Sequence, residues 1–190
     1  WKGWGIEPSI VMGHGAGAYT AACVSGVFSL EDCLKLLGAQ ESLMAGLPEK
    51  GAMAAVFAGE SRVAAALEPY ASEVEIAAFN GQGNTVISGT ERAVKTVIGD
   101  LEAKGIKTRK LRVAFGFHSP VVEPILTAFE QVASQITYSL PRIDLISDMT
   151  GQLVKDEITT PQYWRRHLRQ PLRFASGMQA LHQQGYQVFV

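Results

Sequence analysis

The 190-residue sequence has few charged side chains and almost no cysteine. Charged residues make up 18% of the chain and nearly cancel to a formal net charge of −1, which excludes the cationic surface typical of proteins that bind nucleic acids or anionic membranes. Cys23 and Cys33 lie in helical patterns without the spacing of metal ligands, which favours free thiols in a reducing compartment. The sequence also lacks a secretory signal and an apolar run of about 18 residues. We therefore expect a cytoplasmic protein without a metal site.

Apolar residues are abundant, at 47% of the sequence, which is typical of a globular domain. The length is sufficient for one domain, or for a main domain with an inserted subdomain. The sequence begins at Trp1 and stops inside the apolar run YQVFV, which is typical of a strand. We therefore expect a segment of a longer polypeptide that is truncated at both ends.

The outer parts of the sequence alternate strand and helix patterns. A capping box, SLED at residues 29–32, indicates the start of a helix that reaches about Met44. The other elements predicted in these parts are strands at 8–12, near 143–147 and at 186–190, and helices at 18–28, 120–135, near 160–168 and at 174–184. This alternation predicts an α/β, hydrolase-like body built on a parallel sheet.

The middle of the sequence forms a separate block. It predicts strands at 52–58, 74–80, 84–89 and 107–113, with helices at 61–71 and 90–105. The GQG between the two central strands is typical of a hairpin turn, because no helix follows it as in a phosphate-binding loop. The order β-α-β-β-α-β is that of a ferredoxin-like unit. We expect a body formed by residues 1–50 and 114–190, with an inserted ferredoxin-like subdomain at 51–113.

The stretch VMGHGAGAYTAA, residues 11–22, has the pattern of a nucleophile elbow. In such an elbow, G-x-S-x-G, a strained turn between a strand and a helix carries a serine at its tip. The tip position here is Gly15, which has no hydroxyl. The pattern thus predicts the shape of an elbow without its nucleophile.

Four segments along the chain carry a family resemblance: WGIEPSIVMGHGAGAYTAACVSGVFSLEDCLKLL, AAFNGQGNTVISG, FGFHSPVVEPIL and YWRRHLRQPLRFASGMQAL. In this order they resemble the acyltransferase domains of type I modular polyketide synthases, which are similar to malonyl-CoA:acyl-carrier-protein transacylases. The resemblance covers essentially the whole chain. It implies polyketide biosynthesis with acyl-CoA and the phosphopantetheine of an acyl carrier protein as substrates and no bound cofactor. The implied partners are that carrier protein and the ketosynthase and linker domains of one multidomain polypeptide, and neither nucleic acid nor a membrane.

The resemblance also implies roles for single residues. In the family a serine at position 15 attacks the thioester, and His118 in FHSP corresponds to its general base. The backbone N–H of Ala16 corresponds to an oxyanion-hole donor. His14, Gly116 and Phe117 fall in the substrate-binding segments.

Four positions depart from the family pattern: Gly15 replaces the serine, Ala18 a glutamate, Gln40 the arginine that clamps a malonyl carboxylate, and Asp148 an asparagine near the catalytic histidine. A neutral amide cannot form the bidentate, charge-assisted pair that guanidinium makes with a carboxylate. Since nucleophile and clamp serve different steps, we expect a degenerate domain that is catalytically inactive. It would then be kept as a structural or docking element, with extender units supplied by a trans-acting acyltransferase.

Two alternatives remain open. In the first, the chain is an engineered Ser-to-Gly variant of an active transferase, and Gln40 suits a starter-type monocarboxylate substrate. In the second, His118 activates water and the domain hydrolyses thioesters slowly.

The remaining candidates have simpler interpretations. We expect His167 to form local contacts, His182 to be solvated, Ser25 to pack in a helix and Ser119 to begin one. The arginines at 165, 166, 169 and 173 face either an acidic carrier protein or CoA phosphates, or form an ordinary solvated helix face.

Overall fold

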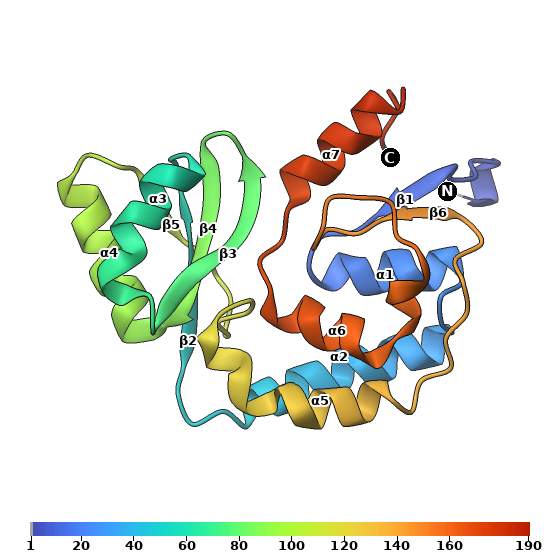
Figure 1. Cartoon of the computed structure of the whole chain (residues 1–190), viewed down its shortest axis with the longest axis horizontal. Coiled ribbons are helices and arrows are strands. Elements are labelled where there is room, and N and C mark those ends of the chain that lie inside the picture. The colour runs from blue at the N-terminus through green and yellow to red at the C-terminus, as the bar shows by residue number, and fades with distance from the viewer. Residues whose placement is uncertain (1) are drawn as a thin grey trace.

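Two sheets of different kinds organise the chain in a computed structural model, which describes residues 2–190 (Figure 1). One sheet is parallel and pairs β1 (Ile10–Met12) with β6 (Asp144–Ile146). The other is antiparallel, with the strand order β3-β4-β2-β5. Its strands are β2 (Gly51–Val56), β3 (Val74–Gly81), β4 (Asn84–Thr90) and β5 (Thr108–Lys110). The predicted α/β class is therefore confirmed.

The antiparallel sheet carries the predicted β-α-β-β-α-β order. Its helices are α3 (Glu60–Leu67) and α4 (Glu91–Ala103), which pack on the sheet around a core of small and branched side chains. Gly81 pairs with Asn84 across a two-residue turn, so the predicted hairpin at GQG is confirmed. In Figure 1 this sheet and its two helices stand beside the rest of the chain. The assignment of residues 51–113 as an inserted subdomain stays a prediction.

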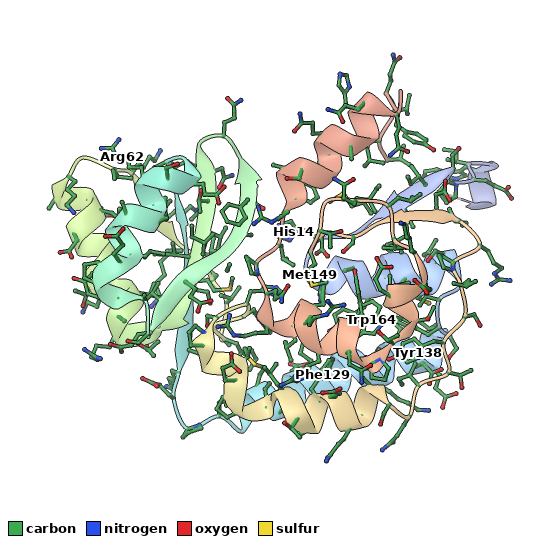
Figure 2. The ribbon with its side chains drawn as sticks, viewed as in Figure 1. His14, Arg62, Phe129, Tyr138, Met149 and Trp164 are labelled. Carbon is green, nitrogen blue, oxygen red and sulfur yellow. The ribbon has the colours of Figure 1, made fainter. Side chains whose placement is uncertain are left out.

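The remaining helices surround the parallel strands. They are α1 (Ala16–Ser25), α2 (Leu30–Ala45), α5 (Leu126–Ala133), α6 (Pro161–Arg169) and α7 (Phe174–Gln183), with short 3-10 turns at η1 (Lys2–Trp4), η2 (Glu68–Tyr70), η3 (Pro120–Ile125) and η4 (Asp156–Thr159). Trp164 is fully buried at their centre, with its ring 4.6 Å from that of Tyr19 and 5.1 Å from that of Phe28. Its Nε1–H donates to the carbonyl of Ile158, at 3.1 Å, so burial leaves this donor satisfied. Figure 2 shows Trp164 and Phe129 within this helical part. This aromatic core holds α1 and α6 together behind the elbow.

Two predicted elements differ in the structure. The helix expected at 120–135 is divided into η3 and α5, because Pro124 lacks the N–H that a continuous α-helix needs there. The strand expected at 186–190 is wrong: Val188 is 84% exposed, and among the described residues no strand pairs with this segment. An apolar run becomes a strand only where a neighbour accepts its backbone hydrogen bonds.

The segment after α6 attaches the antiparallel sheet to the helical part. Leu172 donates its N–H to the carbonyl of Ala77 (2.8 Å) and accepts from the N–H of Phe79 (2.7 Å) on β3. The Arg169 guanidinium at the end of α6 binds both carboxylate oxygens of Glu75, at 2.7 and 2.9 Å. These bonds fix the position of the antiparallel sheet relative to the helical part. Within residues 2–190, no helix has the length and apolar character needed to cross a membrane.

Candidate active site

The turn between β1 and α1 has the backbone of an elbow. Gly15 adopts φ 58° and ψ −118°, a region that residues with a side chain rarely enter. A Cβ on Gly13 would lie 2.1 Å from the backbone of Gly17, so the strand passes the helix this closely only because position 13 is glycine. The turn keeps the strained dihedral angles although no serine stands at its tip.

Position 15 has room for a side chain. A Cβ built on Gly15 meets only the Cδ1 of Leu172 within 4 Å, at 3.9 Å, which is ordinary van der Waals contact. Gly15 and Leu172 both line a cleft of about 250 Å³ between the helical part and the antiparallel sheet. The tip of the elbow therefore faces the cleft without a side chain.

The predicted base, His118, lies in the same cleft. It is 7% exposed, and among residues 2–190 it is the one non-glycine residue with positive φ, at 56°. Burial, together with the nearby His167 and His14, lowers the pKa of His118 to about 3, against the opposing charge of Asp148. The imidazole is therefore neutral at pH 7. Its Nδ1 is buried without a hydrogen-bond partner among the described residues.

Asp148 forms a buried link to the elbow. Its Oδ2 accepts the N–H of Gly15 at 2.8 Å, and its Oδ1 lies 3.0 Å from Nε2 of His167. Asp148 is 0% exposed and His167 is 1% exposed. Burial alone raises the pKa of Asp148, but its electrostatic interaction and hydrogen bond with His167 and the hydrogen bond from the Gly15 N–H outweigh burial and hold this pKa below its ordinary value. The carboxylate is ionised and accepts only, so Nε2 of His167 is the donor.

Sequence reasoning missed this link, although it named both residues. The sequence predicts only local contacts for His167, and Asp148 is a departure from the family pattern near the predicted catalytic histidine. Tyr163 and His167 lie four residues apart on the buried face of α6, and Asp148 follows the buried end of β6. A histidine and a carboxylate at two buried positions are a signal, since buried charges are paired in folded proteins.

Gln40, predicted to stand at the position of the family arginine, lies in the cleft wall. Its Oε1 accepts the hydroxyl hydrogen of Tyr19 at 2.9 Å. Burial raises the pKa of Tyr19 far above its ordinary value, so this phenol stays a donor. The amide nitrogen of Gln40 offers hydrogen bonds but no charge.

The other predicted site residues take different places. Ala16 begins α1 and lines the cleft, so its N–H belongs to the free donors at a helix N-terminus. Phe117 also lines the cleft, whereas Gly116 is buried against the backbone of β2 and β4. His14 lies at the boundary between the two parts (Figure 2) and its Nε2 is 2.8 Å from Oδ1 of Asn80. Ala18, predicted to stand at the family glutamate position, is buried in α1.

The arginine cluster is largely engaged within the chain. Arg165 pairs with Glu130, Arg169 bridges Glu75 and Glu123, and Arg173 lies over the ring of Phe79. Arg166, the fourth member of the cluster, is exposed. As expected, Ser25 is buried within α1, Ser119 caps η3, and His182 is exposed near the end of α7. Cys23 and Cys33 are free thiols.

Known proteins match the chain over its whole length. The family model described as acyl transferase domain matches residues 1–190. The spectinabilin polyketide synthase system protein NorB of Streptomyces orinoci is 41% identical over 188 residues, which cover 98% of this chain and 9% of NorB. The acyltransferase domain from the second module of the salinomycin polyketide synthase has a TM-score of 0.91 at 42% identity, covering 97% of this chain and 43% of that one. The malonyl-CoA:acyl carrier protein transacylase FabD of Xanthomonas oryzae has a TM-score of 0.88 at 28% identity, covering 97% of this chain and 62% of that one.

The chain thus spans about a tenth of NorB and less than two thirds of either solved chain. Both solved structures share its fold over nearly all of its residues. The elbow, the buried histidine and the cleft therefore lie inside the matched region. The chain belongs to the acyl transferase domain family, and it is an acyltransferase domain of the polyketide synthase type, similar to malonyl-CoA:acyl-carrier-protein transacylases.

Proposed function

We propose that this acyltransferase domain does not transfer acyl groups and is kept as a structural or docking element of a polyketide synthase. The observation that carries the proposal is Gly15 at the tip of an otherwise intact elbow. Acyl transfer in this family needs an oxygen nucleophile that stores the acyl group as an ester. Loss of the serine in a hydrolase triad lowers kcat by about 10⁶-fold. Such a rate would not load a synthase.

The other residues around position 15 support a transferase domain that has lost its activity. We assign His118 as the former general base and the N–H of Ala16 as an oxyanion donor, since both line the cleft beside position 15. Gln40 occupies the place of a carboxylate clamp without the charge to act as one. His14 and Phe117 are assigned to the former substrate pocket that they line, together with the adjacent Gly116.

The partners follow from the same proposal. The family substrates are acyl-CoA and a carrier protein's phosphopantetheine, and the neighbours are ketosynthase and linker domains of one polypeptide. Extender units would then come from a trans-acting acyltransferase. We place the domain in the cytoplasm, where its free thiols stay reduced, and we assign residues 51–113 as the ferredoxin-like insertion.

Intact-mass spectrometry tests the proposal. The chain is incubated with acetyl-CoA or malonyl-CoA, beside the variants Gly15→Ser and Gly15→Ala. We expect no acyl adduct on the unaltered chain or on Gly15→Ala, and an adduct on Gly15→Ser. An acyl adduct on the unaltered chain overturns the proposal, because another side chain would then store the acyl group.

The intact elbow favours one alternative, a starter-type transferase in which a serine has been replaced at position 15. The strained turn and the open space at Gly15 are those a serine would require. Gln40 suits an acyl group without a free carboxylate. Acylation of Gly15→Ser by acetyl-CoA and not by malonyl-CoA supports this alternative, and the reverse preference excludes it.

The slow hydrolase has less support. His118 alone would supply general base catalysis, which contributes about 10²- to 10⁴-fold, without the ester that a nucleophile stores. We expect the same thioester hydrolysis rate from the unaltered chain and from His118→Ala.

A further inference from the structure

Two donors from distant elements converge on the carboxylate of Asp148. The Gly15 N–H comes from the turn before α1, and the His167 Nε2–H comes from α6. Asp148 stands in the loop after β6, and each of its oxygens accepts one of these hydrogens. All solvent is excluded from it, since it is 0% exposed. No water can replace either partner at this position.

The charge of this carboxylate acts on the cleft. The ring of His167 meets the ring of His118 edge to face, with centroids 5.8 Å apart. His167 thus contacts both Asp148 and His118, which places an anionic group one side chain away from the His118 imidazole. In a buried site an ionised group stabilises a neighbouring opposite charge more strongly than in water.

We propose that Asp148, held in place by His167, is a positioning residue: it fixes the peptide N–H of residue 15, and with it the direction in which a side chain leaves the elbow, and it supplies the negative charge that stabilises a protonated His118. The inference rests on the proposed function, because it takes position 15 as the nucleophile position and His118 as the base. Asp148 then supports the geometry of the site, and its difference from the family asparagine does not indicate that the site has degenerated.

The asparagine of the family pattern cannot make the same two bonds. Its amide has one accepting oxygen and one donating nitrogen, whereas Asp148 accepts from both sides. If the amide oxygen of an Asp148→Asn variant faces the Gly15 N–H, the amide nitrogen faces Nε2 of His167, which must then carry a lone pair. The proton moves to Nδ1 of His167, which is buried without a partner among residues 2–190.

The tautomer of His167 provides a test that needs no activity. In ¹⁵N-histidine NMR spectra of the unaltered chain we expect His167 as the Nε2–H tautomer with a hydrogen-bonded proton. Asp148→Asn is expected to convert it to the Nδ1–H tautomer or to abolish that proton signal. His182, exposed on α7, is the internal control, and His167→Gln assigns the resonance. A His167 signal that is the same in the unaltered chain and in Asp148→Asn overturns the inference.

A kinetic test uses the Gly15→Ser background and acetyl-CoA. We expect Asp148→Asn to slow acyl-enzyme formation about 10- to 100-fold, the range found when a hydrogen-bond partner that orients a functional side chain is removed. His167→Gln keeps a donor toward Asp148 and should stay near the parent rate, whereas His167→Leu should match Asp148→Asn. Equal rates in all four proteins contradict the inference. If Gly15→Ser itself forms no ester, the proposed function is at fault, and the NMR result still decides the role of Asp148.

Discussion

The two walls of the cleft differ in chemistry. The wall from the helical part carries Gly15, Gln40, His118 and His167, while the wall from the antiparallel sheet is apolar except for Asn80. The apolar lining of the sheet wall consists of Met53, Ala78, Val86, Leu111 and Val113. The titratable groups thus belong to one wall. The other wall gives the cleft an apolar surface and determines its shape. Under the proposed function, the absence of a hydroxyl at position 15 removes the chemistry of the first wall and leaves the second wall unchanged.

The largest effect should come from the first wall. We expect Gly15→Ser to raise acylation by acetyl-CoA by several orders of magnitude, since removal of such a serine costs about 10⁶-fold. The side chain must enter a strained φ region, so the free energy of unfolding should fall by about 1–3 kcal/mol. Chemical denaturation and intact-mass measurements check both. Gly15→Ala is the matched control, with the same strain and no adduct.

The next largest effect is the change in stability with pH that the first wall causes. His118 binds a proton near pH 6.5 when unfolded and only near pH 3 when folded, so the unfolded chain holds more protons between these values. Stability should therefore fall as the pH drops from about 6.5 to 3 and should not change through this group above 6.5. His14, His167 and Asp148 face this ring, and Asp148 adds a loss in the same direction at lower pH.

Urea unfolding at several pH values measures this response. His118→Gln should flatten the curve between about pH 6 and pH 4, and His182→Gln, at an exposed site, should leave it as it is. A curve that His118→Gln does not flatten would mean that the imidazole titrates in the folded state near its ordinary pKa.

The sheet wall should behave in the opposite way. Met53→Ala removes a side chain that is 8% exposed and should lower the free energy of unfolding by about 2–5 kcal/mol. In the Gly15→Ser background it should leave the acylation rate by acetyl-CoA within a few-fold. A loss as large as that of Asp148→Asn would show that this wall also orients the reacting groups.

The smallest effect concerns the attachment of the two walls. Arg169→Lys replaces a bidentate contact to Glu75 with a point charge and should cost about 1 kcal/mol or less. Hydrogen exchange should rise in the segment 170–173 and in β3. The same exchange in α4, which packs on β2 and β4 (Figure 1), serves as the reference.

Most of the fold could be predicted from the sequence, because the signals for helix starts and turns are local. The capping serine at the start of α2 and the hairpin turn before Asn84 were both predicted from neighbouring residues. Predictions failed where a distant partner decides the outcome. The apolar run at 186–190 has no strand beside it among the described residues, and Pro124 divides a pattern that is otherwise helical.

The site shows the same division. Gly13 and Gly17 indicate an elbow, and Gly15 indicates the missing hydroxyl, because each of these depends on the residue type at one position. The sequence by itself thus determined that this protein has an elbow whose tip carries no side chain. Only the tertiary structure decided that Asp148 binds Gly15 and His167, since the residues are 133 and 19 positions apart and a hydrogen bond depends on distance in space.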